Sequence, residues 1–177
     1  MVLVAILAIL PFALRVPDAV MRTVYPLQYE QVIREASEEN GLEPAFVAAV
    51  IYTESRFRPG VASHKDAYGL MQLLPQSARY IQRKSGIEGD YRDPEVNIRL
   101  GTWFLGYLKD QYDGNERLML AAYNSGEGSV NAWTSDKGFD IEKDIPYKET
   151  REYVERALEA RQAYRELYGK DLRENGG

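Results

Sequence analysis

The sequence predicts an all-α fold for most of a chain of 177 residues. Apolar residues recur at spacings of three and four along successive segments, which is the period of the buried face of an α-helix. Prolines and Asn-Gly, Ser-Gly and Asp-Gly pairs separate these segments, and such residues start and stop helices. No segment shows a convincing alternation of apolar and polar residues, the pattern of a half-buried strand.

The first two helices are predicted within residues 27–54. The apolar pattern of the first ends at an Asn-Gly pair, a common C-terminal stop. Pro44 suits the first turn of the second helix, which continues to Glu54. Because Glu54 lies four residues after Val50 and three after Ile51, it continues the apolar face of this helix. The sequence therefore places one carboxyl group on a buried face at a helix end.

The later helices follow from the same signals. Asp93, Pro94 and Glu95 form a strong start signal, because aspartate caps the first turn and proline suits the first helical position. The last helix is followed by a charged segment that ends in glycines, which we expect to fray. The predicted helices cover residues 75–85, 94–112, 115–124, 130–133 and 149–168, with a loop at 138–143 and a flexible tail at 169–177.

Composition excludes several classes of function. The chain has no cysteine, which excludes disulfides, thiol nucleophiles and thiolate metal sites. His64 is the only histidine, and no Ser-His-Asp triad or multi-histidine metal site can be assigned around it, so we expect no metal and no cofactor. The net charge of -5 comes with no concentrated basic stripe, which argues against a nucleic-acid partner.

The N-terminus is a separate hydrophobic segment. Residues 2–14 are apolar apart from the interrupting Pro11. This run is shorter than the about 20 apolar residues of a membrane-spanning helix and has the length of a signal-peptide core, although no Lys or Arg precedes Arg15. We expect residues 1–22 to be an export signal or an uncleaved membrane anchor, and the alternative is a buried N-terminal helix.

The chemistry expected of Glu54 follows from its position. A carboxyl group on an apolar helix face is partly desolvated, and desolvation raises its pKa. A carboxylic acid that is still protonated near neutral pH can donate a proton to a leaving oxygen. Glu54 is therefore the candidate general acid of the chain.

Four short motifs follow one another along the chain: Glu-Ser at 54–55, Gly-Leu-Met-Gln at 69–72, Ala-Tyr-Asn-Ser-Gly at 122–126 and Glu-Thr-Arg-Glu-Tyr-Val at 149–154. Each alone has an ordinary structural explanation, such as a glycine turn, a helix stop or a charged helix start. Together and in this order they resemble the catalytic domain of the soluble lytic transglycosylase family, lysozyme-like enzymes that cut bacterial peptidoglycan. The resemblance covers about residues 27–168 and implies a lysozyme-like helical domain with a substrate groove.

The resemblance assigns roles to individual positions. It makes Glu54 the single catalytic acid and base. It places Ser55 and Ser63 in the stretch that lines the cleft. It also assigns contacts with the glycan to Gln72 and to the backbone of Met71.

The other part of the implied groove comes from later segments. Tyr123 and Asn124 match the pair beside the reacting sugar, and Glu149 matches a glutamate on the far wall. The sequence departs from the family at two positions. Asp66 stands where the family commonly has glycine, and Tyr68 fills a usually variable position.

The resemblance also implies a reaction. Glu54 would protonate the oxygen between N-acetylmuramic acid and N-acetylglucosamine, and the muramic 6-hydroxyl would then close onto C1 to leave a 1,6-anhydro end. The 2-acetamido carbonyl would stabilise the developing charge, as in the substrate-assisted glycosidases. Two alternatives remain open: a hydrolase similar to goose-type lysozyme or chitinase, and a non-catalytic glycan-binding module on the same fold.

The expected partner and location follow from the same resemblance. The partner is the glycan strand of peptidoglycan. Together with the hydrophobic N-terminal segment, this predicts an exported protein of the cell envelope, either anchored to the membrane or secreted to the cell wall.

Overall fold

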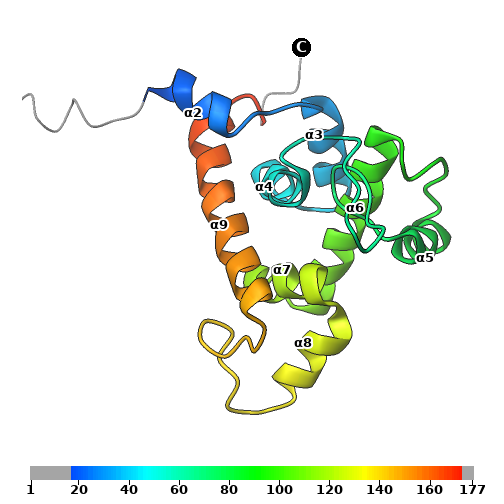
Figure 1. Cartoon of the computed structure of the whole chain (residues 1–177), viewed down its shortest axis with the longest axis vertical. Helices are drawn as coiled ribbons and strands as arrows, with labels where there is room; N and C mark the ends of the chain where they lie inside the picture. The colour runs from blue at the N-terminus through cyan, green and yellow to red at the C-terminus, as the bar shows by residue number, and fades with distance from the viewer. Residues whose placement is uncertain (1–16, 173–177) are drawn as a thin grey trace, which may run out of the picture.

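Helix α4, Pro44–Ser55, lies at the centre of the fold (Figure 1). Its sequence is apolar on nearly all sides, and every residue from position 45 to position 51 is buried. A helix that is hydrophobic all round belongs in the interior of a domain. The structure, a computed structural model, describes residues 17–172, and within them α4 packs against helices α3 and α9.

The other helices surround α4, and the described residues contain no strand beyond two isolated β-bridges in the loop after α4. The all-α prediction is confirmed. Figure 1 shows α9 along one side of α4 and α6 on the other, with α5 and α8 at the periphery. The bounds are α2 Asp18–Val24, α3 Glu30–Glu39, α5 Pro75–Ser85, α6 Pro94–Gln111, α7 Glu116–Ser125, α8 Glu127–Thr134 and α9 Lys148–Tyr168.

The residues that the sequence marks as helix starts cap the N-termini of α6 and α7 in the structure. Asp93 Oδ1 accepts the backbone N–H groups of Glu95 and Val96 at 3.0 and 3.1 Å, which satisfies two donors at the start of α6. Asn115 caps α7 in the same way by accepting the N–H of Leu118 at 3.2 Å. Helix α8 begins at residue 127, earlier than the predicted 130, so α7 and α8 are separated by a single glycine.

Part of the predicted N-terminal segment is attached to the domain. Residues 1–16 lie outside the described part of the chain, but α2 overlaps the end of the segment predicted at 1–22. Arg22 donates a hydrogen bond to the carbonyl of Leu167 at 2.6 Å, and its guanidinium lies 4.4 Å from the centre of the Tyr168 ring. Among the described helices, none is long and apolar enough to cross a membrane. The function of the N-terminal segment therefore stays a prediction.

The C-terminal residues pack further than the sequence predicts. Leu172 is 3% exposed and belongs to the main hydrophobic core. The carbonyl of Asp171 accepts a hydrogen bond from Arg34 at 3.2 Å. Residues 169–172, expected to belong to a flexible tail, are thus packed on the domain, because Leu172 reaches an apolar site that a count of charges does not reveal. The rest of the predicted tail lies outside the described residues.

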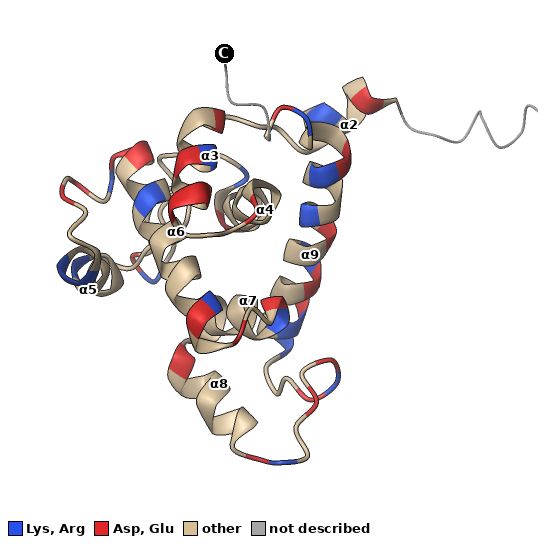
Figure 2. Ribbon diagram, turned by 180° about the vertical axis from the view of Figure 1, so that it is seen from behind, with Lys and Arg blue, Asp and Glu red and all other residues tan. Residues whose placement is uncertain are grey.

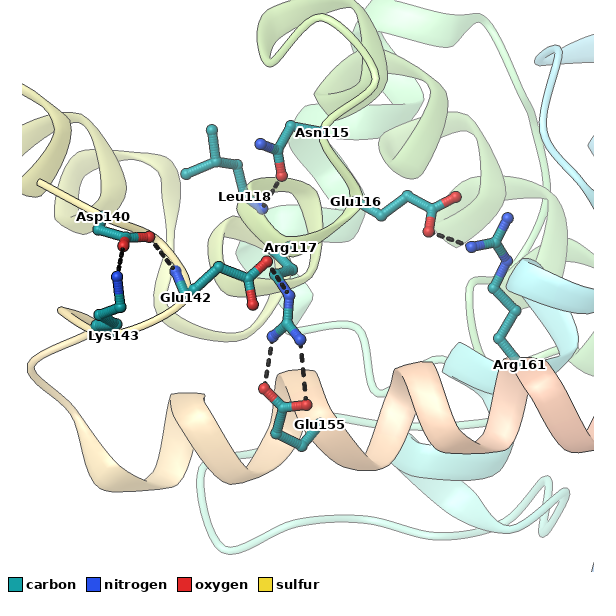
Figure 3. A network of polar contacts seen from close by, with 9 residues as sticks. All are labelled: Asn115, Glu116, Arg117, Leu118, Asp140, Glu142, Lys143, Glu155 and Arg161. Atoms are coloured by element: carbon teal, nitrogen blue, oxygen red, sulfur yellow. Dashed lines mark hydrogen bonds and ion pairs between the residues drawn. The ribbon is translucent and has the colours of Figure 1, made fainter.

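Ion pairs attach the loop between α8 and α9 to the domain (Figure 3). Arg117 on α7 pairs with Glu142 of this loop at 2.8 Å and with Glu155 of α9 at 2.5 Å. One guanidinium therefore joins three segments. Figure 2 shows charged residues of both signs along α9, which is the pattern of a helix with one solvent-facing side.

The loop between α4 and α5 is held by Asn97 of α6. This buried side chain donates to the carbonyls of Tyr68 and Tyr91 at 3.1 and 2.8 Å, and it accepts the N–H of Met71 at 2.8 Å. Gly69 has to lack a side chain, because a Cβ atom there would lie 2.6 Å from Asn97 Nδ2. The loop is thereby fixed to the helix beneath it.

We expect Asn97→Ala to lower the free energy of unfolding by about 2–3 kcal/mol, because it leaves the N–H of Met71 and the carbonyl of Tyr91 without partners, whereas the carbonyl of Tyr68 still accepts the N–H of Leu73. Urea unfolding followed by circular dichroism measures this loss. Asn131→Ala is the matched control: Asn131 is exposed and accepts one hydrogen bond, from Tyr112, so its loss is about 0.5 kcal/mol or less. Equal losses in the two variants would contradict the role given to Asn97.

Candidate active site

The carboxyl group of Glu54 lies where the end of α4 meets α9. Its Oε1 atom accepts a hydrogen bond of 2.7 Å from the hydroxyl of Tyr153. Tyr153 is 3% exposed, whereas Glu54 keeps part of its surface open to solvent. The packing of α4 against α9 therefore holds an acid and its hydrogen-bond donor together at a place that a ligand can reach.

Burial sets the protonation of Glu54. Loss of water raises the pKa of its carboxyl group from the usual 4.5 to about 7. The hydrogen bond from Tyr153 and the positive charge of Arg156 lower this pKa, but they do not offset the burial. The carboxyl group is thus close to half-protonated at neutral pH. Its pKa is raised, as the sequence predicts.

The two arginines that follow Glu54 in the sequence bond elsewhere. Arg56 donates to the hydroxyl of Tyr52 at 3.0 Å. Arg58 donates through Nε to the carbonyl of Ser55, also at 3.0 Å. Neither contributes to the shift in the pKa of Glu54, which leaves Arg156 as its cationic neighbour.

The chain reverses direction directly after the acid. Arg56 and Phe57 both have left-handed backbone angles, with φ of 52° and 59°, which is uncommon for residues other than glycine. The Phe57 side chain is 2% exposed, and its burial in the core stabilises this strained turn. Ser55 lies beneath the turn, 1% exposed, and its hydroxyl donates to the carbonyl of Ile51 at 3.0 Å. Its predicted place in the lining of the cleft would require this hydroxyl to leave the helix.

Ser63 and Asp66 shape the loop that follows. The Ser63 hydroxyl oxygen accepts the N–H groups of Lys65 and Ala67 at 3.2 and 3.1 Å. Asp66 is exposed and has a φ of 63°. A left-handed angle explains why a glycine suits this position, and aspartate is one of the residues that tolerate it. The departure at Asp66 therefore leaves the turn intact.

The segment 69–72 brings the loop to α7. The carbonyl of Met71 accepts a hydrogen bond of 2.8 Å from the hydroxyl of Tyr123. Gln72 has a φ of 47°, and its amide nitrogen donates to the carbonyls of Val61 and Gly69 at 3.0 and 2.9 Å. The nitrogen of Gln72 thus supports the loop, and its side-chain oxygen is the atom left to accept a hydrogen bond from a ligand.

Helix α9 also positions the amide of Asn124. Its Oδ1 atom accepts a hydrogen bond of 2.9 Å from the buried hydroxyl of Thr150. Burial and the nearby negative charge of Glu54 hold the pKa of Tyr123 well above its usual value, so this hydroxyl remains a donor. The neighbouring Glu149 is exposed on the first turn of α9, and its contact with a glycan stays a prediction.

Sequence reasoning missed three residues that build the site: Thr150, Tyr153 and Asn97. The first two belong to the motif at 149–154 and are three residues apart, so a helix turns both toward the same side. Tyr153 lies on the apolar face of α9, where its ring alone explains its burial, and only its hydroxyl indicates that it can bond to Glu54. No local signal identifies Asn97, because its partners lie in loops distant in sequence.

The domain is helical, and one carboxyl group with a raised pKa lies at the end of its central buried helix. This arrangement is typical of the lysozyme-like class. Within residues 17–172, no group of three or more His, Asp or Glu side chains is placed to bind a metal ion. Residues 31–145, more than half of the chain, match the family described as the Transglycosylase SLT domain. The chain belongs to this family.

The chain is also similar in sequence to lytic murein transglycosylases. The soluble lytic murein transglycosylase of Escherichia coli (strain K12) is 32% identical over 155 residues, which are 82% of this chain and 24% of the relative. The membrane-bound lytic murein transglycosylase C of Pectobacterium atrosepticum is 36% identical over 124 residues, 62% of this chain and 35% of that protein. The chain thus spans about a quarter to a third of the length of these relatives.

Two solved structures share the fold. The inactive mutant of the lytic transglycosylase Slt from Pseudomonas aeruginosa, in which glutamine replaces a glutamate, is 32% identical and has a TM-score of 0.78 over 84% of this chain and 26% of that chain. The 70 kDa soluble lytic transglycosylase from Escherichia coli is 31% identical and has a TM-score of 0.80 over 84% of this chain and 26% of that chain. The lysozyme-like fold class is confirmed.

A carbon-13 NMR titration of the Glu54 carboxyl group is expected to show a midpoint at about 7. Arg156→Gln should move this midpoint upward, because it removes a positive charge that favours the carboxylate. Arg56→Gln is the matched control and should leave it in place, since Arg56 bonds to Tyr52. A midpoint near 4.5 in the unmodified protein, or equal shifts in both variants, would refute the assigned cause.

Proposed function

We propose that the chain is a peptidoglycan lytic transglycosylase in which Glu54 is the sole acid and base. One observation carries the proposal: a partly exposed carboxyl group whose pKa of about 7 lets it release and recover a proton near neutral pH. The relatives that share the family are named as murein transglycosylases, which supports peptidoglycan as the substrate. The chain covers only part of the length of these relatives, so the proposed activity rests on the geometry around Glu54 in this chain.

The first step breaks the glycosidic bond. Glu54 donates its proton to the oxygen between N-acetylmuramic acid and N-acetylglucosamine, and the bond from this oxygen to muramic C1 breaks. The 2-acetamido carbonyl of the muramic unit stabilises the positive charge at C1. The hydroxyl of Tyr153 donates to the Glu54 carboxylate that forms, at the position where it already lies 2.7 Å from Oε1.

The second step returns the proton to Glu54. The carboxylate accepts the proton of the muramic 6-hydroxyl, and the oxygen of that hydroxyl forms a bond to C1. The products are a 1,6-anhydromuramic end and a free 4-hydroxyl on the leaving sugar. The first step consumes the proton that the second step restores, so the protein is unchanged after each turnover.

The surroundings of Glu54 favour this route over a two-carboxylate glycosidase. A retaining glycosidase has a second carboxylate about 5 Å from its acid, and such a neighbour would raise the pKa of the acid. Among the described residues, no other carboxylate contributes to the pKa shift of Glu54. An acetamido group of the substrate can take the place of the missing nucleophile.

The neighbouring side chains are suited to orient the sugar. Because the oxygen of Asn124 accepts from Thr150, its amide nitrogen is directed to donate to another partner, such as the acetamido carbonyl. Gln72 offers a side-chain oxygen to a sugar hydroxyl or amide. We assign further glycan contacts to Ser63 and Glu149, both of which have some exposure to solvent.

Two other functions make different predictions. A hydrolase on the same fold would add water to C1 and leave a reducing end, whereas the proposed reaction leaves an anhydro end. A non-catalytic binding module would retain glycan affinity and release no product. Mass spectrometry of the fragments from purified peptidoglycan separates the three, because the anhydro product lacks the mass of one water.

We expect Glu54→Gln to lower turnover of peptidoglycan by at least about 10²–10⁴-fold, because general acid and base assistance is lost in both steps. Glu159→Gln is the matched control, since Glu159 is exposed on α9, and it should keep full activity. Mass spectrometry and release of soluble fragments measure both variants. A well-folded Glu54→Gln variant with near-normal turnover would exclude Glu54 as the acid.

We also propose that the protein works in the cell envelope, anchored through the segment of residues 1–22 or secreted to the wall. The apolar sequence of this segment and the cell-wall substrate support the location. Fractionation of producing cells should find the protein in the membrane or outside the cytoplasm. Recovery of the full-length protein from the cytoplasmic fraction, with an intact N-terminus, would refute it.

A further inference from the structure

Helix α2 turns its apolar side away from the domain. Val20 and Val24 are 50% and 47% exposed, and because they are four residues apart they lie on one face of the helix. Arg22 lies two residues from each valine and so points to the opposite side, where it contacts α9. A surface helix ordinarily packs its apolar face on the core of its own domain. In α2 the arginine faces the domain and the two valines face outward.

Contacts within the domain fix this orientation of α2. In addition to its contacts with the end of α9, Arg22 pairs with Asp171 at 3.3 Å. Directly after the helix, the carbonyl of Tyr25 accepts a hydrogen bond of 2.8 Å from the hydroxyl of Tyr168. Turning the valines toward the domain would break these contacts. Their exposure is therefore a property of the folded domain.

The exposed face of α2 has an apolar neighbour in the sequence. None of the seven residues of α2 is buried, and helices this short are marginal in water unless other contacts stabilise them. Residues 2–14 are apolar apart from Pro11, and this run ends shortly before α2 begins at Asp18. The apolar character of the N-terminal segment thus continues into the outward face of α2.

The size of this face favours lipid over protein as its partner. A stable protein interface buries about 800 Å² on each partner, which is far more than two valine side chains offer. A bilayer surface accepts a small apolar helix face, because the side chains enter the boundary between headgroups and acyl chains while the rest of the helix stays outside. The apolar segment before α2 would keep the helix at this surface.

We propose that the face of α2 formed by Val20 and Val24 lies in the surface of a lipid bilayer, and that the end of α9 that carries Tyr168 faces this surface. The inference rests on the proposed location and extends it, because it makes part of the folded domain a membrane contact. Figure 1 shows α2 at this end of α9 and α8 beyond the other end. Tyr153, the partner of Glu54, lies fifteen residues before Tyr168, which is about 22 Å along the helix. The length of α9 thereby keeps the acid clear of the lipid headgroups.

The test places one dye at each end of α9, which the lack of native cysteine makes possible. Val24→Cys and Lys148→Cys, each in the full chain and labelled with an environment-sensitive dye, are reconstituted with vesicles of phosphatidylcholine and phosphatidylglycerol. The vesicles contain lipids with a nitroxide quencher next to the headgroup. We expect the dye at position 24 to shift to shorter wavelength and to lose most of its emission. Lys148 is the matched control, because it is exposed at the opposite end of α9, and its dye should change little.

The other outcomes overturn the inference. Equal quenching at positions 24 and 148 would contradict the orientation, and a dye at position 24 that stays unquenched would exclude the lipid contact. A shift to shorter wavelength without quenching would show that protein covers the face, either a second copy or the segment before α2. Thermal unfolding confirms that both labelled variants are folded. Cleavage of peptidoglycan and fractionation of cells separately decide the proposed function and location.

Discussion

The burial of one carboxyl group without a full countercharge is the constraint on which the site depends. Glu54 sits at the end of the most apolar helix of the fold, and α9 covers it with a tyrosine in place of a base. The resulting pKa of about 7 destabilises the folded state increasingly between pH 4.5 and about 7, and it keeps a proton on Glu54 for acid chemistry in the same range. A salt bridge at this place would stabilise the carboxylate and so remove the proton donor. Arg56 and Arg58, the adjacent arginines, form no such salt bridge, because they donate to the Tyr52 hydroxyl and to the carbonyl of Ser55.

The rest of the structure fixes the loop after α4 beside this acid. The loop after α4 contains several left-handed residues, and such backbone persists only where the surroundings fix it. Phe57 fixes the first turn from the core, Asn97 fixes the middle from α6, and the hydroxyl of Tyr123 fixes Met71 from α7. Three separate helices therefore determine where the loop stands relative to Glu54. The geometry of the site therefore depends on contacts between residues far apart in the sequence, although each motif is a short local segment.

The sequence predicted the helices and the acid because both leave periodic or local signals. Caps at Asp93 and Asn115 and the apolar stripe that ends in Glu54 can be seen in a few neighbouring residues. The partner of the acid could not be identified this way, because Tyr153 lies ninety-nine positions away and its ring alone explains its place in the core. The same limit applies to Asn97 and to Leu172, whose positions depend on segments that pack beside them only in three dimensions.

The pH dependence of stability tests the central claim most directly. Below about pH 4.5 the carboxyl group of Glu54 is protonated in both the folded and the unfolded chain. Between 4.5 and about 7 it ionises only in the unfolded chain, so the unfolded state binds fewer protons and folding stability falls as pH rises. The account predicts that Glu54→Gln gains stability over the unmodified protein across this window, by about 3 kcal/mol at pH 8. Denaturant unfolding at pH 4 and pH 8 measures this gain, with Glu159→Gln as the control. A stability difference that stays constant between the two pH values would contradict the account.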